Sequence, residues 1–218
     1  MADPAETDPD ALTDTGLAPS GQGAVLVIAC GALAREILAI TRTAGWTHVD
    51  LACLPAILHN HPEKIAERVR TAVLRARETY SAVFVAYADC GTGGALKKVC
   101  DELGVEMISG PHCYSFFEGN AAFSAHEDEI TAFYLTDFLA RQFDAFVWKP
   151  LGLDRHPELI EMYFGNYTKL VYQSQIEDPA LLARAQSCAD RLGLEFEHRR
   201  TGFGELESSL RNWVSSPR

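Results

Sequence analysis

The 218-residue sequence lacks any apolar stretch of the roughly 18 residues that a membrane span requires. Its first residues also lack the basic segment and the apolar core of a secretory signal peptide. These absences predict a cytoplasmic protein with no membrane partner. Because thiols stay reduced in the cytoplasm, the six cysteines are expected to be buried packing residues, metal ligands or nucleophiles rather than disulfides.

Basic residues are scarce. The chain has 19 Lys and Arg against 30 Asp and Glu, which gives a formal net charge of −11. Five of the acidic residues lie among the first 19 residues, which contain no Lys or Arg. A surface that follows nucleic-acid phosphates needs clusters of basic residues, so we expect no nucleic-acid partner.

The first 23 residues have no aromatic side chain and no hydrophobic periodicity. They are rich in Ala, Asp, Thr, Pro and Gly, and we predict a disordered acidic tail over residues 1–23. Residues 24–218 are long enough for a single α/β domain. Because His61–Ile65 resembles His156–Ile160, two similar halves that meet near residues 115–155 are an alternative; shared helix-start chemistry also explains the likeness.

Strand-like and helix-like segments alternate along the chain. This alternation predicts a three-layer α/β sandwich with a mainly parallel, Rossmann-like sheet of about six strands. The aromatic-rich segment 131–148 is expected to form a long buried helix that covers the sheet. The expected strands are 24–29, 48–53, 81–86, 105–109, 168–172 and 194–198, and the other main expected helices are 32–43, 62–79, 95–103, 179–192 and 204–213.

The rest of the sequence is organised around the stretch Tyr87–Gly94, where an apolar strand breaks into Asp-Cys-Gly-Thr-Gly-Gly. In open α/β sheets, ligands bind outside the carboxyl ends of strands. Cys90 lies at such an end, Cys30 follows the first expected strand, and Cys113 follows the fourth. We therefore expect these three thiols to face one crevice.

Thiolates serve both as metal ligands and as nucleophiles. Together with His59 or His112, the thiols of Cys30, Cys90 and Cys113 would form a set of ligands suited to zinc or to an iron–sulfur cluster. The sequence contains no CxxC pair, so spacing alone does not reveal such a site. Buried packing is the alternative for every cysteine, and it is our interpretation of Cys53, Cys100 and Cys188.

The glycine-rich turn offers a second kind of site. Backbone amides of Gly91, Thr92, Gly93 and Gly94 could hold a small-molecule anion or cofactor in front of a helix. The turn is neither a Walker loop nor a GxGxxG motif, and a simple tight turn is the alternative. Asp89 is interpreted as a cap for the following helix, with a general base as the alternative.

Five phrases of the sequence are distinctive: Cys30–Leu33, Leu58–Pro62, Tyr87–Gly94, Gly110–Tyr114 and Tyr163–Tyr167. Through these phrases the chain resembles the domain-of-unknown-function 1638 family of bacteria and archaea over about residues 24–213. Some members of that family are found near corrinoid-dependent methyltransferase systems. The resemblance therefore implies a link to one-carbon metabolism and a corrinoid or methyltransferase protein as a partner.

A looser likeness to the aspartate/glutamate racemase superfamily implies a different chemistry. In it Cys90 and Cys113 would be a catalytic acid–base pair, free of metal, for racemisation, isomerisation or a lyase reaction of a small carboxylate. Their sequence contexts depart from that superfamily's motifs. A third hypothesis is a non-catalytic accessory module that binds a cofactor for a partner. A homo-oligomer is compatible with all three hypotheses.

Overall fold

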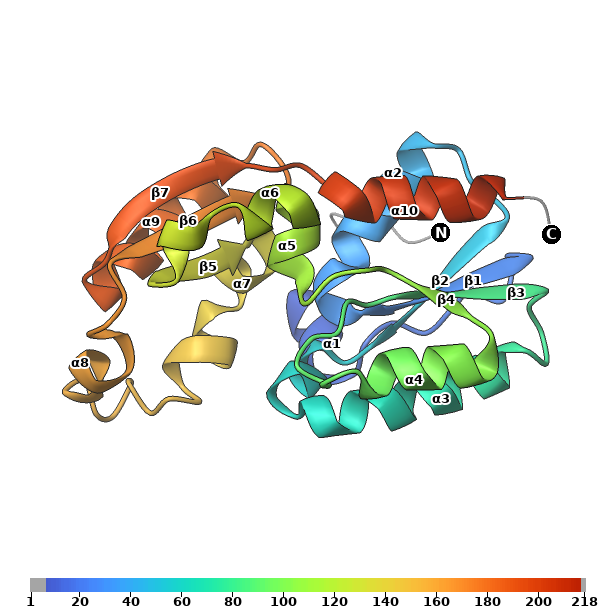
Figure 1. Cartoon of the computed structure of the whole chain (residues 1–218), viewed down its shortest axis with the longest axis horizontal. Helices are drawn as coiled ribbons and strands as arrows, with labels where there is room; N and C mark the ends of the chain where they lie inside the picture. Colours follow the sequence, from blue (N-terminus) through green and yellow to red (C-terminus); the bar gives the residue numbers. More distant parts are fainter. Residues whose placement is uncertain (1–6, 217–218) are drawn as a thin grey trace. The chain divides into compact units, whose positions relative to one another are not determined.

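The computed structural model describes residues 7–216, and the chain divides into two compact units (Figure 1). Unit 1 comprises residues 1–116 together with 205–218, and unit 2 comprises residues 117–204. The sequence predicted one domain, or two halves that meet near residues 115–155. In the described part of the chain, no helix combines the length and the apolar character needed to cross a membrane.

Unit 1 is built on a four-stranded parallel sheet in the order β2-β1-β3-β4. Strands β1 and β3 are almost wholly buried, as expected for a parallel sheet covered on both faces. Because all four strands run in the same direction, their carboxyl ends lie along one edge of the sheet. The strands are β1 (Val25–Cys30), β2 (Val49–Leu54), β3 (Ala82–Ala86) and β4 (Glu106–Met107).

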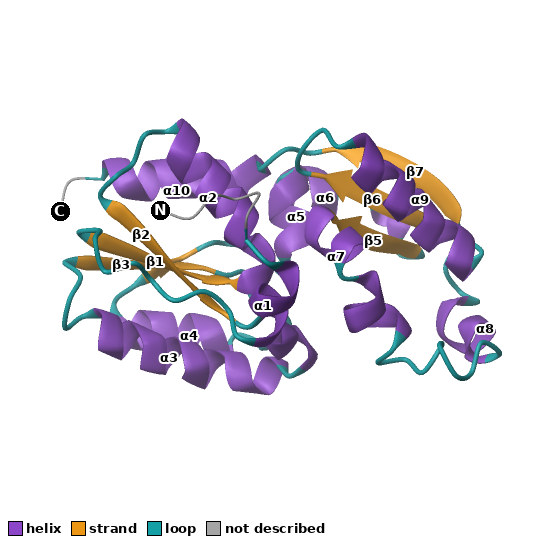
Figure 2. Ribbon diagram, turned by 180° about the vertical axis from the view of Figure 1, so that it is seen from behind, coloured by secondary structure: helices purple, strands orange, loops and turns teal. Residues whose placement is uncertain are grey.

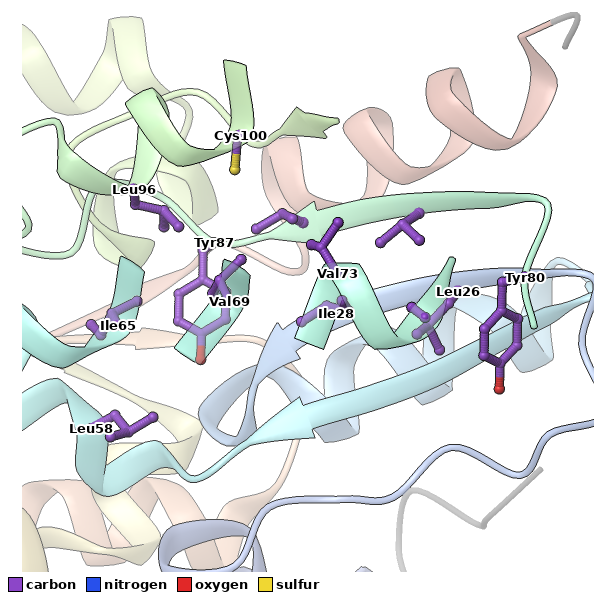
Figure 3. Packing of buried hydrophobic residues seen from close by; sticks show 13 residues of the cluster. Leu26, Ile28, Leu58, Ile65, Val69, Val73, Tyr80, Tyr87, Leu96 and Cys100 are labelled. Carbon is purple, nitrogen blue, oxygen red and sulfur yellow. The ribbon is translucent and has the colours of Figure 1, made fainter. Parts of the chain in front are cut away.

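Helices lie on both sides of this sheet, with α3 and α4 on one side and α2 and α10 on the other (Figures 1 and 2). Figure 3 shows the packing of Ile28 on β1 with Val69 and Val73 on α3. On the other side, the ring of Trp213 on α10 lies 5.2 Å from that of Phe84 on β3. These helices are α2 (Ala34–Thr43), α3 (Ile65–Ala76), α4 (Ala95–Leu103) and α10 (Gly204–Ser215).

Shorter helices connect the strands of unit 1 to the longer helices. Three of them are 3-10 helices in the connections that follow β1 and β2, and α5 follows the β4 segment. Their bounds are η1 (Gly31–Leu33), η2 (Ala56–Asn60), η3 (Pro62–Lys64) and α5 (Cys113–Glu118).

The segment that was expected to be a disordered tail differs from that prediction wherever it is described. Residues 1–6 lie outside the described residues, but helix α1 (Pro9–Asp14) buries Leu12, and Leu17 forms a β-bridge with Cys53. Asp50 then accepts hydrogen bonds from the backbone of Ser20 and Gly21. These long-range contacts offset the conformational entropy that the segment loses when it becomes ordered. Its local composition gives no sign of these contacts.

Unit 2 has its own parallel sheet, in the order β5-β6-β7. The α/β class with parallel strands is therefore confirmed, whereas one sheet of about six strands is wrong, because the strands form sheets of four and of three. The elements of unit 2 are α6 (Asn120–Ser124), η4 (Glu127–Glu129), β5 (Ala132–Thr136), α7 (Asp137–Arg141), the π-helix η5 (Asp144–Trp148), α8 (Leu159–Phe164), β6 (Lys169–Ser174), α9 (Pro179–Leu192) and β7 (Glu195–Arg200).

The expected long helix over residues 131–148 is wrong, because its first part is strand β5. Phe133 and Leu135 point to the apolar core that contains α9, and Tyr134 points to the opposite face, where its hydroxyl contacts Glu129. This alternation has the period of a strand. Aromatic residues also favour strands, so composition alone does not separate the two states.

Candidate functional site: a thiol cluster in unit 1

The backbone brings Cys90 to the segment that precedes Cys113. Beyond the end of β3, the Asp89 amide donates to the Gly110 carbonyl at 3.0 Å, and the Cys90 amide donates to the Pro111 carbonyl at 2.8 Å. Cys30 is the last residue of β1, the strand that pairs with β3. The segments that carry Cys90 and Cys113 therefore lie side by side, next to the strand that pairs with β1.

The three thiols influence one another's pKa values. Burial raises the pKa of Cys30 to about 11 and that of Cys113 to about 12. Burial also raises the pKa of Cys90, and the next contributions come from Cys113 and Cys30. At neutral pH the thiols are therefore protonated in this arrangement.

Cys90 has a strained backbone. Its φ is 50°, and among the described residues it is the sole non-glycine residue with a positive φ. The left-handed region costs a residue with a Cβ about 1–2 kcal/mol. Strain of this kind persists where the surrounding structure enforces it, and it clusters at functional sites.

Two further side chains, Tyr87 and Cys53, interact with Cys30. Tyr87 is only 2% exposed, and its ring packs among Ile65, Val69 and Leu96 (Figure 3). Burial raises its pKa, and Cys30 adds to this effect. Cys53 also interacts with Cys30. The parallel register aligns Cys53 with Ala29 and Cys30 with Leu54, so Cys53 lies on the neighbouring strand without being the direct partner of Cys30.

His59 and His112 form a second group in unit 1. Desolvation lowers the pKa of both imidazoles, and the charge of His59 lowers that of His112 further. Both rings are therefore neutral at physiological pH, which is the form that binds metals. His112 also accepts a hydrogen bond at Nδ1 from the Ser115 amide at 3.3 Å, at the start of α5.

The glycine-rich turn is folded around an acidic side chain of its own. The Asp89 carboxylate accepts hydrogen bonds from Thr92 Oγ1 and the Gly94 amide, both at 2.7 Å, and from the Gly93 amide at 3.1 Å. Burial raises the Asp89 pKa, but these hydrogen bonds outweigh it and leave the pKa below its usual value. The Gly93 and Gly94 amides, which were candidates for binding an external anion, therefore already donate to Asp89. It does not cap α4 directly, because the N-cap residue is Gly94.

The thiols and imidazoles are ligands suited to soft metals, but those of the described residues are not arranged as a metal site. Within residues 7–216, no three His, Cys, Asp or Glu side chains are grouped so that they could hold a metal ion as they stand. The remaining two cysteines, Cys100 and Cys188, are buried in the apolar cores of unit 1 and unit 2. Their burial agrees with a packing role.

Fold and site together define an α/β protein with partly buried thiols beside the carboxyl edge of a parallel sheet. A family model described as "Protein of unknown function (DUF1638)" matches residues 53–210, and the chain belongs to this family. The match includes Cys90, Cys113, His59 and His112, whereas Cys30 precedes it. A search of curated proteins gave no match.

Proposed function

We propose that unit 1 binds a thiophilic metal, as zinc or as an iron–sulfur cluster, through the thiols of Cys30, Cys90 and Cys113. The observation that carries this proposal is the strained backbone of Cys90, whose thiol interacts with both other thiols. A sequence without function would be expected to relieve this strain with glycine, as the same turn does at Gly91, Gly93 and Gly94. Retention of a cysteine at this position supports a role for its sulfur.

The charges around the thiols favour a cation over a carboxylate substrate. Glu36 contributes to the raised pKa of Cys30 and Cys113, and Asp89 contributes to that of Cys90. A bound cation would offset the repulsion among thiolates and acidic groups, and it would make deprotonation favourable. A carboxylate would instead add another negative charge.

Cys30, Cys90 and Cys113 would hold the metal, with the neutral imidazole of His59 or His112 as a fourth ligand. The metal would supply Lewis acidity, which can activate a thiol or a methyl-group substrate. This chemistry is compatible with corrinoid-linked methyl transfer. The connection to one-carbon metabolism, and to a corrinoid or methyltransferase partner, rests on the family association alone.

Elemental analysis of protein purified without oxygen tests the proposal. We expect stoichiometric zinc or iron in the wild-type protein and loss of most of it in Cys90→Ala and Cys113→Ala. Cys100→Ala is the matched control, because Cys100 is a buried thiol of the same unit that packs in the apolar core. Absence of metal from every preparation, or equal metal in Cys90→Ala and Cys100→Ala, would refute the proposal.

A second candidate is acid–base catalysis by Cys90 and Cys113 on a small carboxylate. It is supported by one observation: among the charged neighbours of Cys90, Cys113 has the largest effect on its pKa. Incubation with racemisable amino acids or hydroxy acids in D₂O would reveal such an activity as deuterium at the α-carbon, lost in both Cys→Ala variants. Protein that is metal-free, inactive in this assay and slow to alkylate would instead support the accessory-module hypothesis.

A further inference from the structure

Unit 2 contains a separate pocket of about 230 Å³. It lies at the carboxyl ends of β6 and β7, beside the first turn of α9; Figure 2 shows these three elements. Carboxyl ends of parallel strands are the usual place for ligands in α/β sheets.

A serine–histidine pair lines this pocket. Ser174 is the last residue of β6 and is 3% exposed, and its Oγ lies 2.9 Å from Nε2 of His198 on β7. Either atom can donate in this hydrogen bond. In both cases the pair retains one donor and one acceptor, divided between Ser174 Oγ and His198 Nδ1. A ligand group that can both donate and accept a hydrogen bond can therefore pair with one of these atoms in either tautomer.

Ring stacking and hydrogen bonds hold the pocket wall beside this pair in place. The Tyr172 ring stacks on His198 with centroids 5.5 Å apart, and its hydroxyl donates to Asp137 Oδ1 at 2.6 Å. The other oxygen of Asp137, which is 1% exposed, accepts from the Ile176 amide at 3.0 Å. Satisfied buried polar groups of this kind fix a loop before a ligand arrives.

The charges at the pocket disfavour an anion. Asp178 caps α9, because its carboxylate accepts from the amides of Ala180 at 3.0 Å and Leu181 at 3.1 Å. The Asp178 carboxylate is thus the anion at this helix N-terminus. Without it, the N-terminus would attract a phosphate or carboxylate. The guanidinium of Arg200 is 3.1 Å from Glu177, so this charge is paired as well.

We propose that this pocket binds a small uncharged molecule with a carboxamide-like group on a compact aliphatic body. The carboxamide would bind the Ser174–His198 pair, and the aliphatic body would contact Ile176, Pro179 and Leu182. Ile176 keeps 41% of its surface exposed, so a bound ligand would remove apolar area from water. The proposal is independent of the thiol cluster in unit 1.

Three probes of similar shape test the proposal on the full-length protein: isobutyramide, isobutyrate and isobutylammonium. We expect isobutyramide to give saturable NMR shifts of the Ser174, Ile176 and His198 amides, and the two ions to bind at least about tenfold more weakly. Ser174→Ala and His198→Ala should each weaken isobutyramide binding about fivefold, since each removes one hydrogen-bonding partner. His198 is an exposed residue, so its variant tests the pair even if Ser174→Ala fails to fold.

Ser208→Ala on α10 is the matched control, because it removes a serine hydroxyl from unit 1 and should leave the isobutyramide affinity unchanged. The proposal is overturned by any of three results. The first is the absence of a saturable shift with isobutyramide. The second is binding of either isobutyrate or isobutylammonium as tight as that of isobutyramide. The third is an unchanged isobutyramide affinity in His198→Ala.

Discussion

At the scale of single residues, Cys90 combines an unfavourable backbone with a reactive side chain. Its neighbours Gly91, Gly93 and Gly94 also have positive φ, but glycine adopts this region without a clash at Cβ. The turn therefore concentrates its conformational penalty at the one position that carries a thiol. This arrangement is expected where a side chain is retained for its chemistry rather than for stability.

Replacement of Cys90 should separate strain from chemistry. Cys90→Gly relieves the left-handed strain and Cys90→Ala retains it, while both remove the sulfur. We expect Cys90→Gly to exceed Cys90→Ala in free energy of unfolding by about 1 kcal/mol. Urea denaturation at constant m-value measures this difference. An alanine variant as stable as the glycine variant would show that the left-handed backbone at position 90 carries no appreciable strain.

The sequence predicted that three thiols face one crevice, and this stays a prediction. Cys30, Cys90 and Cys113 could be singled out because each follows an apolar strand-like run, and parallel strands share an edge. Tyr87 and Cys53 could not, because a buried tyrosine or cysteine has the same sequence signature in a core and in a site. Their proximity to Cys30 depends on strand pairing and on side-chain packing.

At the scale of elements, Asp50 links strand β2 to the segment before β1. Its carboxylate accepts from the Ser20 amide at 3.0 Å, from the Gly21 amide at 2.7 Å and from the Tyr80 hydroxyl at 2.8 Å. Burial of Tyr80 and its hydrogen bond to Asp50 raise the tyrosine pKa to about 12. One carboxylate thus organises three separate parts of unit 1.

Loss of the Asp50 carboxylate should release the segment around residues 15–21. Asp50→Ala leaves several donors without an acceptor, and we expect a loss of about 2–3 kcal/mol in the free energy of unfolding. Limited proteolysis should then cleave within this segment much faster than in the wild type. Asp101→Ala, which removes an exposed carboxylate paired with Lys97 on α4, should change neither quantity. Equal cleavage rates in the two variants would contradict the anchoring role of Asp50.

At the scale of the whole molecule, the two units use different means to cover their sheets. Unit 1 has amphipathic helices on both sides, with their apolar faces against the sheet, whereas one face of the sheet in unit 2 carries a network of charges. Arg199 contacts Glu118 at 2.9 Å and Glu129 at 2.7 Å, and Lys169 lies 2.9 Å from Glu129. Breaking such a network from one side leaves uncompensated charges near a buried surface.

This network should make the stability of unit 2 sensitive to acid. Hydrogen bonds from Arg199, together with those of Tyr134 and Lys169, hold the pKa of Glu129 well below its usual range. Because the folded-state pKa is the lower one, Glu129 stabilises the fold above the unfolded pKa of about 4.5, and this contribution is lost as the pH falls below that value.

Glu129→Gln should therefore be less stable than the wild type at pH 7, and the difference should shrink as the pH approaches 3. Urea midpoints followed by circular dichroism between pH 7 and pH 3 measure this difference. Glu127→Gln, an exposed neighbour on the same short helix, is the control and should differ little from the wild type. A constant difference across this pH range would show that the charge of Glu129 does not stabilise the fold.

The sequence by itself determined the α/β class, the helices α4 and α9 with their bounds, the strand end at Cys30 and the turn after β3 that carries Cys90. These features follow from local periodicity, from the turn glycines and from helix caps, which act within a few residues. The tertiary structure decided the division into sheets of four and three strands, the ordered segment after residue 6, the strand β5 and the Ser174–His198 pocket. Each of these depends on contacts between residues far apart in the chain, and such contacts leave no local pattern in the sequence.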